Sequence, residues 1–252
     1  MQNRGQEDMH GPSERKRRYF RLVCVFILLT AALLLYRYKD HDFLNMILRK
    51  HTVASVLSEI GEAEDARWAP RFSAHDLPYP PPALTLLALK EERRLEVWAP
   101  APGGFRQIHT YPILAASGAL GPKLQEGDRQ VPEGIYRLTS LNPNSAFHLS
   151  IRVDYPNAFD LARAGEEGRT NPGSDIFIHG REASIGCIAL GDPAIEELFT
   201  LLARTGLENT RLLIAPRDLR VHASPASPVP WMPGLYQQLK AEMAPLDSSF
   251  EH

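Results

Sequence analysis

The sequence has few cysteines, no excess of charge of either sign and no glycine-rich phosphate-binding loop. Its 252 residues include two cysteines, 28 Lys and Arg, and 30 Asp and Glu, which leave a formal net charge of -2. Two cysteines permit at most one disulfide and exclude a four-cysteine zinc site. The balanced charge argues against a polyanion-binding protein, and the 44% hydrophobic content argues against a disordered or collagen-like chain. At roughly 150 residues per domain, the length suits one or two domains.

The near-neutral charge is an average over unlike segments. Residues 1–21 carry a basic cluster, and the uncharged apolar run LVCVFILLTAALLLY follows it directly from Leu22 to Tyr36. A basic segment before an apolar stretch is typical of an export signal or a signal anchor. Because no A-x-A cleavage site closes the run, we expect an uncleaved membrane anchor over residues 22–38, with a cleaved signal peptide as the alternative. The positive-inside tendency then places everything after about residue 40 outside the cytoplasm.

Composition divides the rest of the chain into a helical part and a strand-rich part. Apolar residues at helical spacing between residues 42 and 64, followed by a proline-rich stretch from Pro70 to Pro82, predict a helical stalk and linker over residues 39–80. Beyond it we expect one domain over residues 81–245, mainly β with a few helices, and a tail over residues 246–252.

The predicted domain contains a hairpin and several further strands. Leu84–Leu89 and Leu95–Trp98 form the hairpin, and one strong helix begins near Asp192, with a weaker helix over residues 234–243. The other strand candidates are residues 105–111, 134–139, 146–153, 175–179 and 211–215.

A single cysteine, Cys187, lies in the exported part, because Cys24 falls within the apolar run. An unpaired thiol in an oxidising space is a liability unless it is reactive, although a buried structural cysteine is the common alternative. His179 ends an apolar strand, and Gly180 permits a sharp turn, so the short connection can bring the thiol beside the imidazole. A histidine within reach can deprotonate a thiol and later protonate a leaving amine. Backbone amides around Ser184 and Gly186 are candidates for an oxyanion site.

The string IHGREASIGCIALGDPAIEEL, together with GPK at residue 121, GDRQVPEGIY at residue 127, NPNSAFHLS at residue 142 and YPN at residue 155, resembles a known family. It is similar to the L,D-transpeptidase (YkuD) catalytic domain, and specifically to its YafK-like branch. The similarity covers roughly residues 80 to 245. The resemblance implies a β-rich L,D-transpeptidase fold outside the cytoplasmic membrane, with peptidoglycan stem peptides as substrate. Together with the N-terminal anchor, it predicts a single-pass protein of the inner membrane whose catalytic domain lies in the periplasm.

In that resemblance, Cys187 matches the nucleophile and His179 the general acid and base, while Ser184 and Gly186 match the loop that shapes the oxyanion site. The implied reaction is acyl transfer at the diaminopimelate position through a thioester on Cys187. Ala189 stands where most members have an arginine and Ile185 where they have a histidine. This departure favours a specialised reaction, such as hydrolysis that releases a peptidoglycan-attached lipoprotein or cross-links. A non-catalytic peptidoglycan-binding module is a further alternative.

Four more polar residues are candidates for the substrate cleft. His148 lies in a strand-like stretch and can carry a proton, bind an amide or serve a structural role. Asp128, Gln130 and Glu133 occupy a Gly/Pro-rich turn, where surface residues of these types are also common. No His or Cys spacing matches a metal site, so we expect neither a metal nor a cofactor, and no nucleic-acid partner.

Overall fold

The computed structural model describes residues 19, 23, 25, 27, 28 and 50–247. The chain divides into two compact units, Met1–Lys50 and His51–His252. Within the described residues, no helix is both long and apolar enough to cross a membrane. The predicted basic segment, membrane anchor and tail lie largely outside the described residues and stay predictions.

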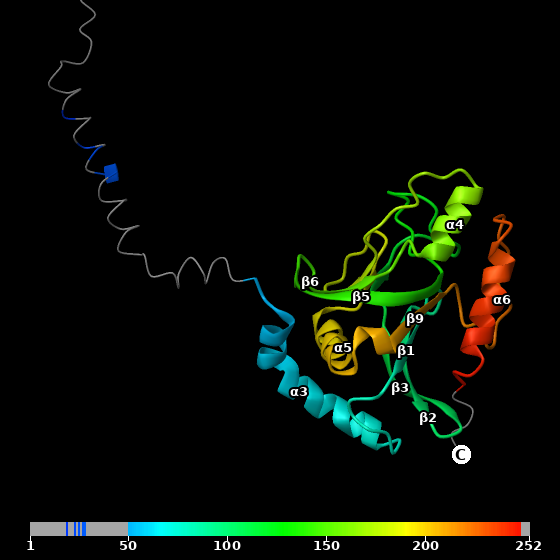
Figure 1. The fold of residues 1–252 in the computed structure, drawn as a ribbon, viewed down its shortest axis with the longest axis horizontal. Coiled ribbons are helices and arrows are strands. Elements are labelled where there is room, and N and C mark those ends of the chain that lie inside the picture. The colour runs from blue at the N-terminus through cyan, green and yellow to red at the C-terminus, as the bar shows by residue number, and fades with distance from the viewer. Residues whose placement is uncertain (1–18, 20–22, 24, 26, 29–49, 248–252) are drawn as a thin grey trace, which may run out of the picture. The chain divides into compact units, whose positions relative to one another are not determined.

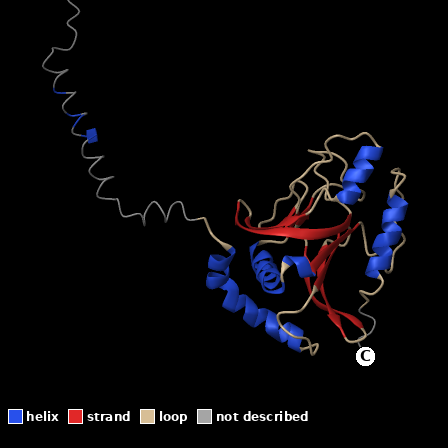
Figure 2. Cartoon of the chain, in the orientation of Figure 1, coloured by secondary structure: helices blue, strands red, loops and turns tan. Residues whose placement is uncertain are grey.

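A nine-stranded sheet forms the centre of the second unit (Figures 1 and 2). Its strand order is β3-β2-β1-β9-β5-β6-β7-β8-β4, and the pairs β1–β9 and β7–β8 are parallel while the others are antiparallel. The strands are β1 (Leu84–Leu89), β2 (Arg94–Ala101), β3 (Gly104–Pro112), β4 (Ala115–Ala116), β5 (Gly134–Ser145), β6 (His148–Val153), β7 (Phe177–His179), β8 (Ile188–Ala189) and β9 (Thr210–Ala215).

Helices cover both faces of this sheet, as Figure 1 shows for α5 and α6. They are α3 (Val53–Ser73), α4 (Ala158–Glu166), α5 (Asp192–Thr205), the short 3-10 helix η1 (Leu207–Asn209) and α6 (Met232–Met243). Alternation along β1 divides the core, since Leu86 and Ala88 pack with α3 and α5 while Leu87 and Leu89 pack with α6. We call these the α5-side core and the α6-side core. Because β1 is buried on both faces, its sequence is an almost uninterrupted apolar run.

Helix α3 differs from the predicted stalk. It begins at Val53 after a Thr52 cap, runs through Pro70 and ends at Ser73. Trp68 and Phe72 are fully buried in the α5-side core, and the Trp68 Nε1–H donates to the Glu197 carbonyl at 2.9 Å. The segment is therefore part of the folded unit. A proline inside a helix removes one backbone donor and crowds the carbonyl four residues earlier, and the burial of two large aromatic residues offsets that cost.

The strand predictions match the observed elements closely, and the hairpin of β1 and β2 and the helices α5 and α6 are confirmed. The sequence reading overlooked α4 and the two-residue strands β4 and β8. Helix α5 begins at Asp192 with Gly191 as its N-cap, and the Asp192 carboxylate accepts from the Arg181 backbone N–H at 2.7 Å.

Replacing Trp68 tests whether α3 contributes to the stability of the folded unit. We expect Trp68→Ala in the full chain to lower the free energy of unfolding by about 3–5 kcal/mol, because it empties a fully buried site. Trp68→Phe keeps most of the apolar volume, so it should cost less. Urea denaturation measures both, and an unchanged free energy of unfolding for Trp68→Ala would show that α3 does not support the core.

Candidate active site

Strands β7 and β8 bring the predicted pair to one face of the sheet. Their parallel register pairs Ile178 with Ile188 and His179 with Ala189. Ile178 and Ile188 point into the α5-side core, so His179 and, one residue before β8, Cys187 both project from the opposite face. Adjacent strands lie about 4.8 Å apart and a two-residue step covers roughly 6.6 Å. At this diagonal separation the two side chains can meet.

The His179 imidazole is held in one tautomer. Its Nδ1 lies 2.6 Å from the Gly180 carbonyl oxygen, which can only accept, so Nδ1 carries the proton and the Nε2 lone pair remains available. The side chain is buried, and the ring lies 4.6 Å from that of Phe147. Burial lowers the pKa of His179, although the Gly180 bond acts in the opposite direction. The imidazole is therefore neutral near pH 7 and able to accept a proton.

The Cys187 thiol is half-buried and protonated in the resting structure. Its Sγ–H points to the Asp175 carbonyl oxygen at 3.7 Å, a long contact. Burial raises the pKa of Cys187, a hydrogen bond with the backbone of Phe177 lowers it, the Asp175 carboxylate raises it and the Lys123 ammonium lowers it. Since burial is the largest of these effects, the pair consists of a thiol and a neutral imidazole rather than an ion pair.

The connection between the two side chains, residues 180–187, is called here the nucleophile loop. The Gly186 and Cys187 N–H groups converge on the Ser184 Oγ, at 3.3 and 3.1 Å, and this hydroxyl donates to the Cys187 carbonyl at 2.6 Å. Two convergent amides are the donor arrangement that an oxyanion requires, and the Ser184 hydroxyl occupies their focus in this structure. Gly186 has φ +124°, a conformation that residues with a Cβ rarely adopt.

Gly180 is required by close packing. A Cβ at this position would lie 2.6 Å from Asp192 Oδ1 and 2.8 Å from the Phe147 carbonyl oxygen. The sequence suggested that Gly180 serves a sharp turn, and the structure adds that no larger residue fits between the start of α5 and the end of the β5–β6 connection.

A second loop, residues 117–132, packs against the nucleophile loop and is called here the cover loop. Ser117 Oγ lies 3.4 Å from Ser184 Oγ and donates to the Arg129 carbonyl at 2.8 Å. The backbone of Arg129 and Gln130 lies just under 4 Å from the position of a Cβ on Gly186. The cover loop thus forms one wall of the site.

Three of the predicted cleft residues hold this loop together. The Asp128 carboxylate accepts from Lys123 Nζ at 2.6 Å and from three backbone N–H groups. The Gln130 amide bridges Ala119 and Gly121. The buried Glu133 carboxylate accepts from Lys90 at 2.9 Å, from the Gly121 N–H and from the Tyr236 hydroxyl at 2.8 Å. Their polar groups are engaged within the protein, and a direct substrate role for them stays a prediction.

The fourth predicted cleft residue, His148, lies at the start of β6. Its Nε2 is 2.6 Å from a Glu196 carboxylate oxygen on α5, and the residue is exposed with φ +71°. The adjacent Phe147, rather than His148, contacts the His179 ring. Sequence reasoning overlooked both Phe147 and Asp175, since neither an exposed aromatic residue nor the main-chain carbonyl of an aspartate gives a distinctive sequence signal.

Strained backbone is concentrated around these residues. Among the described residues, six non-glycine residues have positive φ, and four of them flank the two loops or the strands of the site: Arg129, His148, Asp175 and Arg181. Each such conformation costs about 1–3 kcal/mol. Several strained residues in one place are therefore typical of a functional site.

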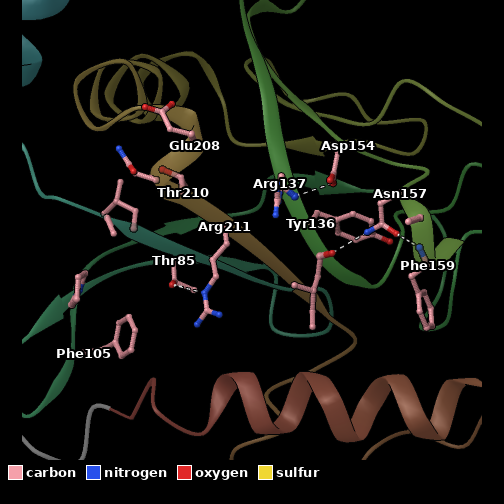
Figure 3. Close-up of a pocket in the computed structure, with 16 residues that line it drawn as sticks. Thr85, Phe105, Tyr136, Arg137, Asp154, Asn157, Phe159, Glu208, Thr210 and Arg211 are labelled. Atoms are coloured by element: carbon pink, nitrogen blue, oxygen red, sulfur yellow. Dashed lines mark hydrogen bonds between the residues drawn. The ribbon is translucent and has the colours of Figure 1, made fainter.

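The site contains no metal-binding cluster within the described part of the chain, where no three His, Cys, Asp or Glu side chains are grouped to hold an ion. A cavity of about 880 Å³ lies elsewhere, at the ends of β1, β9 and β5, and Figure 3 shows Thr85, Arg211, Arg137 and Phe159 around it. Neither Cys187 nor His179 lines that cavity.

Comparison with known proteins identifies the family of the chain. Residues 86–221, more than half of the chain, match the family described as YkuD, the L,D-transpeptidase catalytic domain. The chain belongs to the YkuD L,D-transpeptidase family. It is 38% identical over 112 residues to a protein of Escherichia coli strain K12 named "Putative L,D-transpeptidase YafK", and the same identity holds for YafK of Escherichia coli O157:H7. The match covers 44% of this chain and 43% of that protein, so the chain spans less than half the length of these relatives.

Two solved structures are more distant relatives of this YkuD chain. Pgp2, the helical cell shape determining protein of Campylobacter jejuni, is 20% identical with a TM-score of 0.45, and the match covers 63% of this chain and 52% of Pgp2. Bd1075 of Bdellovibrio bacteriovorus is 22% identical with a TM-score of 0.40, over 65% of this chain and 55% of Bd1075. Because both scores are below 0.5, the family assignment rests on the sequence match.

The electrostatics of Cys187 predict how fast it reacts at different pH values. Because its pKa is raised, we expect alkylation by iodoacetamide, followed at Cys187 by peptide mass spectrometry, to reach its midpoint above the ordinary cysteine value. Asp175→Asn removes a carboxylate that raises this pKa and should move the midpoint to lower pH. Glu182→Gln makes the same charge change in the nucleophile loop without such an effect and serves as the control. A midpoint that Asp175→Asn leaves in place would contradict this account of the site.

Proposed function

We propose that this YkuD protein is a peptidoglycan-modifying cysteine enzyme that transfers acyl groups at the diaminopimelate position of stem peptides. The observation that carries the proposal is the common face of His179 and Cys187, combined with an imidazole whose Nε2 is free to act as a base. The family match supports a peptidoglycan substrate. The nucleophile, the reaction course and the acceptor are the parts that this proposal adds.

The first half of the reaction forms a thioester. Sγ of Cys187 attacks the carbonyl carbon of the substrate amide while Nε2 of His179 takes the thiol proton. The tetrahedral oxyanion accepts hydrogen bonds from the Gly186 and Cys187 amides once the Ser184 hydroxyl turns away from them. The C–N bond then breaks, and the imidazolium gives its proton to the leaving amine.

The second half returns the enzyme to its starting state. An acceptor amine attacks the thioester carbonyl, and Nε2 removes the proton from the attacking nitrogen. The C–S bond breaks, the new amide leaves, and the thiolate recovers its proton from the imidazolium. The same steps with water as acceptor describe the hydrolase alternative, which releases an attached lipoprotein or opens cross-links. In support of a specialised acceptor, Ala189 is fully buried between His179 and Ala115 in the sheet, so that position offers no basic group to a substrate.

Parallel digests of sacculi test the enzyme and its acceptor together. We expect the full-length protein to change the muropeptide profile, Cys187→Ala to abolish the change, and His179→Gln to reduce its rate by about 10²- to 10⁴-fold. Liquid chromatography with mass spectrometry identifies the products, since transfer creates new cross-links whereas hydrolysis only releases peptide or lipoprotein. Cys187→Ala products identical to those of the wild type would overturn the mechanism. A wild-type protein that binds sacculi without altering them would be a binding module.

We also propose that residues 22–38 anchor the protein in the inner membrane with the catalytic domain in the periplasm. The basic cluster before the apolar run supports this orientation. Added protease should cleave the domain in spheroplasts but not in intact cells, while the domain should stay with the membrane fraction. A domain that resists protease in spheroplasts while a periplasmic marker is digested would contradict the orientation.

A further inference from the structure

Arg152 lies on the same face of the sheet as the nucleophile. The register pairs Arg152 with Phe177 across β6 and β7, and Ser150 with His179. Phe177 lies beside Cys187 when the β7–β8 register is extended by one residue. Arg152 is therefore two strands from Cys187, at roughly 10 Å between backbones. An arginine side chain spans much of that distance, so its guanidinium can reach a group close to an amide that Cys187 attacks.

The guanidinium of Arg152 uses only part of its hydrogen-bonding capacity within the protein. Its Nη2 donates to Asp175 Oδ1 at 2.9 Å, and its Cζ lies 6.0 Å from the centre of the Phe177 ring. The Arg152 side chain is 47% exposed and that of Asp175 66% exposed. An exposed ion pair of this kind contributes little to stability and exchanges easily. The remaining N–H groups of the fork have no partner among the described residues, whereas a carboxylate would engage two of them.

Arg152 also differs from the other basic groups near the site. The Lys123 ammonium is buried and bound to Asp128, so it is not free to bind a ligand. Arg129 and Arg181 lie on the cover loop and the nucleophile loop. Arg152 instead projects from a strand paired on both sides, and such a backbone fixes the position of a specificity group more firmly than a loop does.

We propose that Arg152 is a specificity-determining residue that binds a free carboxylate of the acyl-donor peptide, which replaces Asp175 as its partner. The proposal rests on the proposed function. The ligand class is a peptide with an unamidated carboxylate within about one residue of the amide that is cleaved. Asp175 has two roles in this arrangement. Its main-chain carbonyl accepts a hydrogen bond from the Cys187 thiol, and its carboxylate holds the Arg152 guanidinium in place until a substrate carboxylate binds.

Binding to a full-length protein that also carries Cys187→Ala separates this proposal from turnover. The probes are two synthetic stem peptides that differ only in whether the carboxylate nearest the scissile amide is free or amidated, and calorimetry gives the Kd. We expect Arg152→Gln to weaken binding of the free-acid peptide by about 10- to 100-fold and to leave the amidated peptide within about twofold. Arg152→Lys should recover part of the loss, because it keeps the charge and loses the fork.

Two further variants test the competition with Asp175 and control for the loss of a positive charge. Asp175→Asn keeps the backbone carbonyl and a residue type that tolerates positive φ, but it removes the competing carboxylate, so the free-acid peptide should bind several-fold more tightly. Arg137→Gln removes a nearby exposed arginine on β5 and should change neither Kd. Equal weakening of both peptides by Arg152→Gln would indicate a structural role, and unchanged Kd values would remove Arg152 from recognition. Either result overturns the proposal. Failure of the proposed function is a different outcome: sacculi digested with the wild type and with Cys187→Ala would then give the same muropeptides.

Discussion

The register of β7 against β8 is the constraint on which the site depends. Side chains alternate along a strand, so a slip of β8 by one residue against β7 would turn Cys187 into the α5-side core, away from His179, and move Ile188 out of that core. Ile178 and Ile188 are at most 1% exposed to solvent. Strands of three and two residues have few ladder hydrogen bonds of their own, and this burial is what fixes their pairing. A hydrophobic contact on one face of the sheet therefore determines the position of the chemical groups on the other.

The connection between the strands is closed at its base by further bonds. The Leu190 N–H donates to the His179 carbonyl at 2.9 Å, and the Gly191 N–H donates to the Arg181 carbonyl at 3.1 Å. Asp192, the first residue of α5, accepts from the Arg181 N–H, so the loop is attached directly to a helix that lies in the core. On the opposite side, the buried Lys90–Glu133 pair holds the cover loop. Breaking such a pair would leave an uncompensated buried charge, which makes this wall rigid.

The sequence was sufficient for the parts of the fold that alternate or repeat locally. Continuous or alternating apolar runs predicted β1, β2, β3, β5, β6 and β9, and an acidic start with an apolar stripe predicted α5. Helix α4 was overlooked because it is short: it has nine residues, of which only Ala164 is buried. The proline-rich stretch after Pro70 suggested a linker, yet Trp68 and Phe72 bind α3 to the core by tertiary contacts that no local pattern reveals.

The candidate site was predictable to a similar and limited extent. The spacing of His179, Gly180 and Cys187 indicated a pair, because a short connection after a strand must turn back. The polar residues of the cover loop were identified as cleft residues, and the structure uses their side chains for internal bonds. Sequence alone does not distinguish these uses, since a turn beside a cleft needs polar groups to satisfy its own backbone as well as any ligand. Arg152 was not among the candidate site residues, because an arginine in a strand is typically an ordinary solvent-facing residue.

Burial of His179 and Cys187 has two consequences that act together. It raises the pKa of Cys187 and lowers that of His179, so both shifts favour the neutral form of each group. In the proposed reaction, charge then develops only during attack, when the Gly186 and Cys187 amides can stabilise it. A protonated thiol also reacts more slowly with oxidants than a thiolate does. The burial that keeps Cys187 a thiol therefore also limits its oxidation, a property that suits the proposed role of an unpaired cysteine outside the cytoplasm.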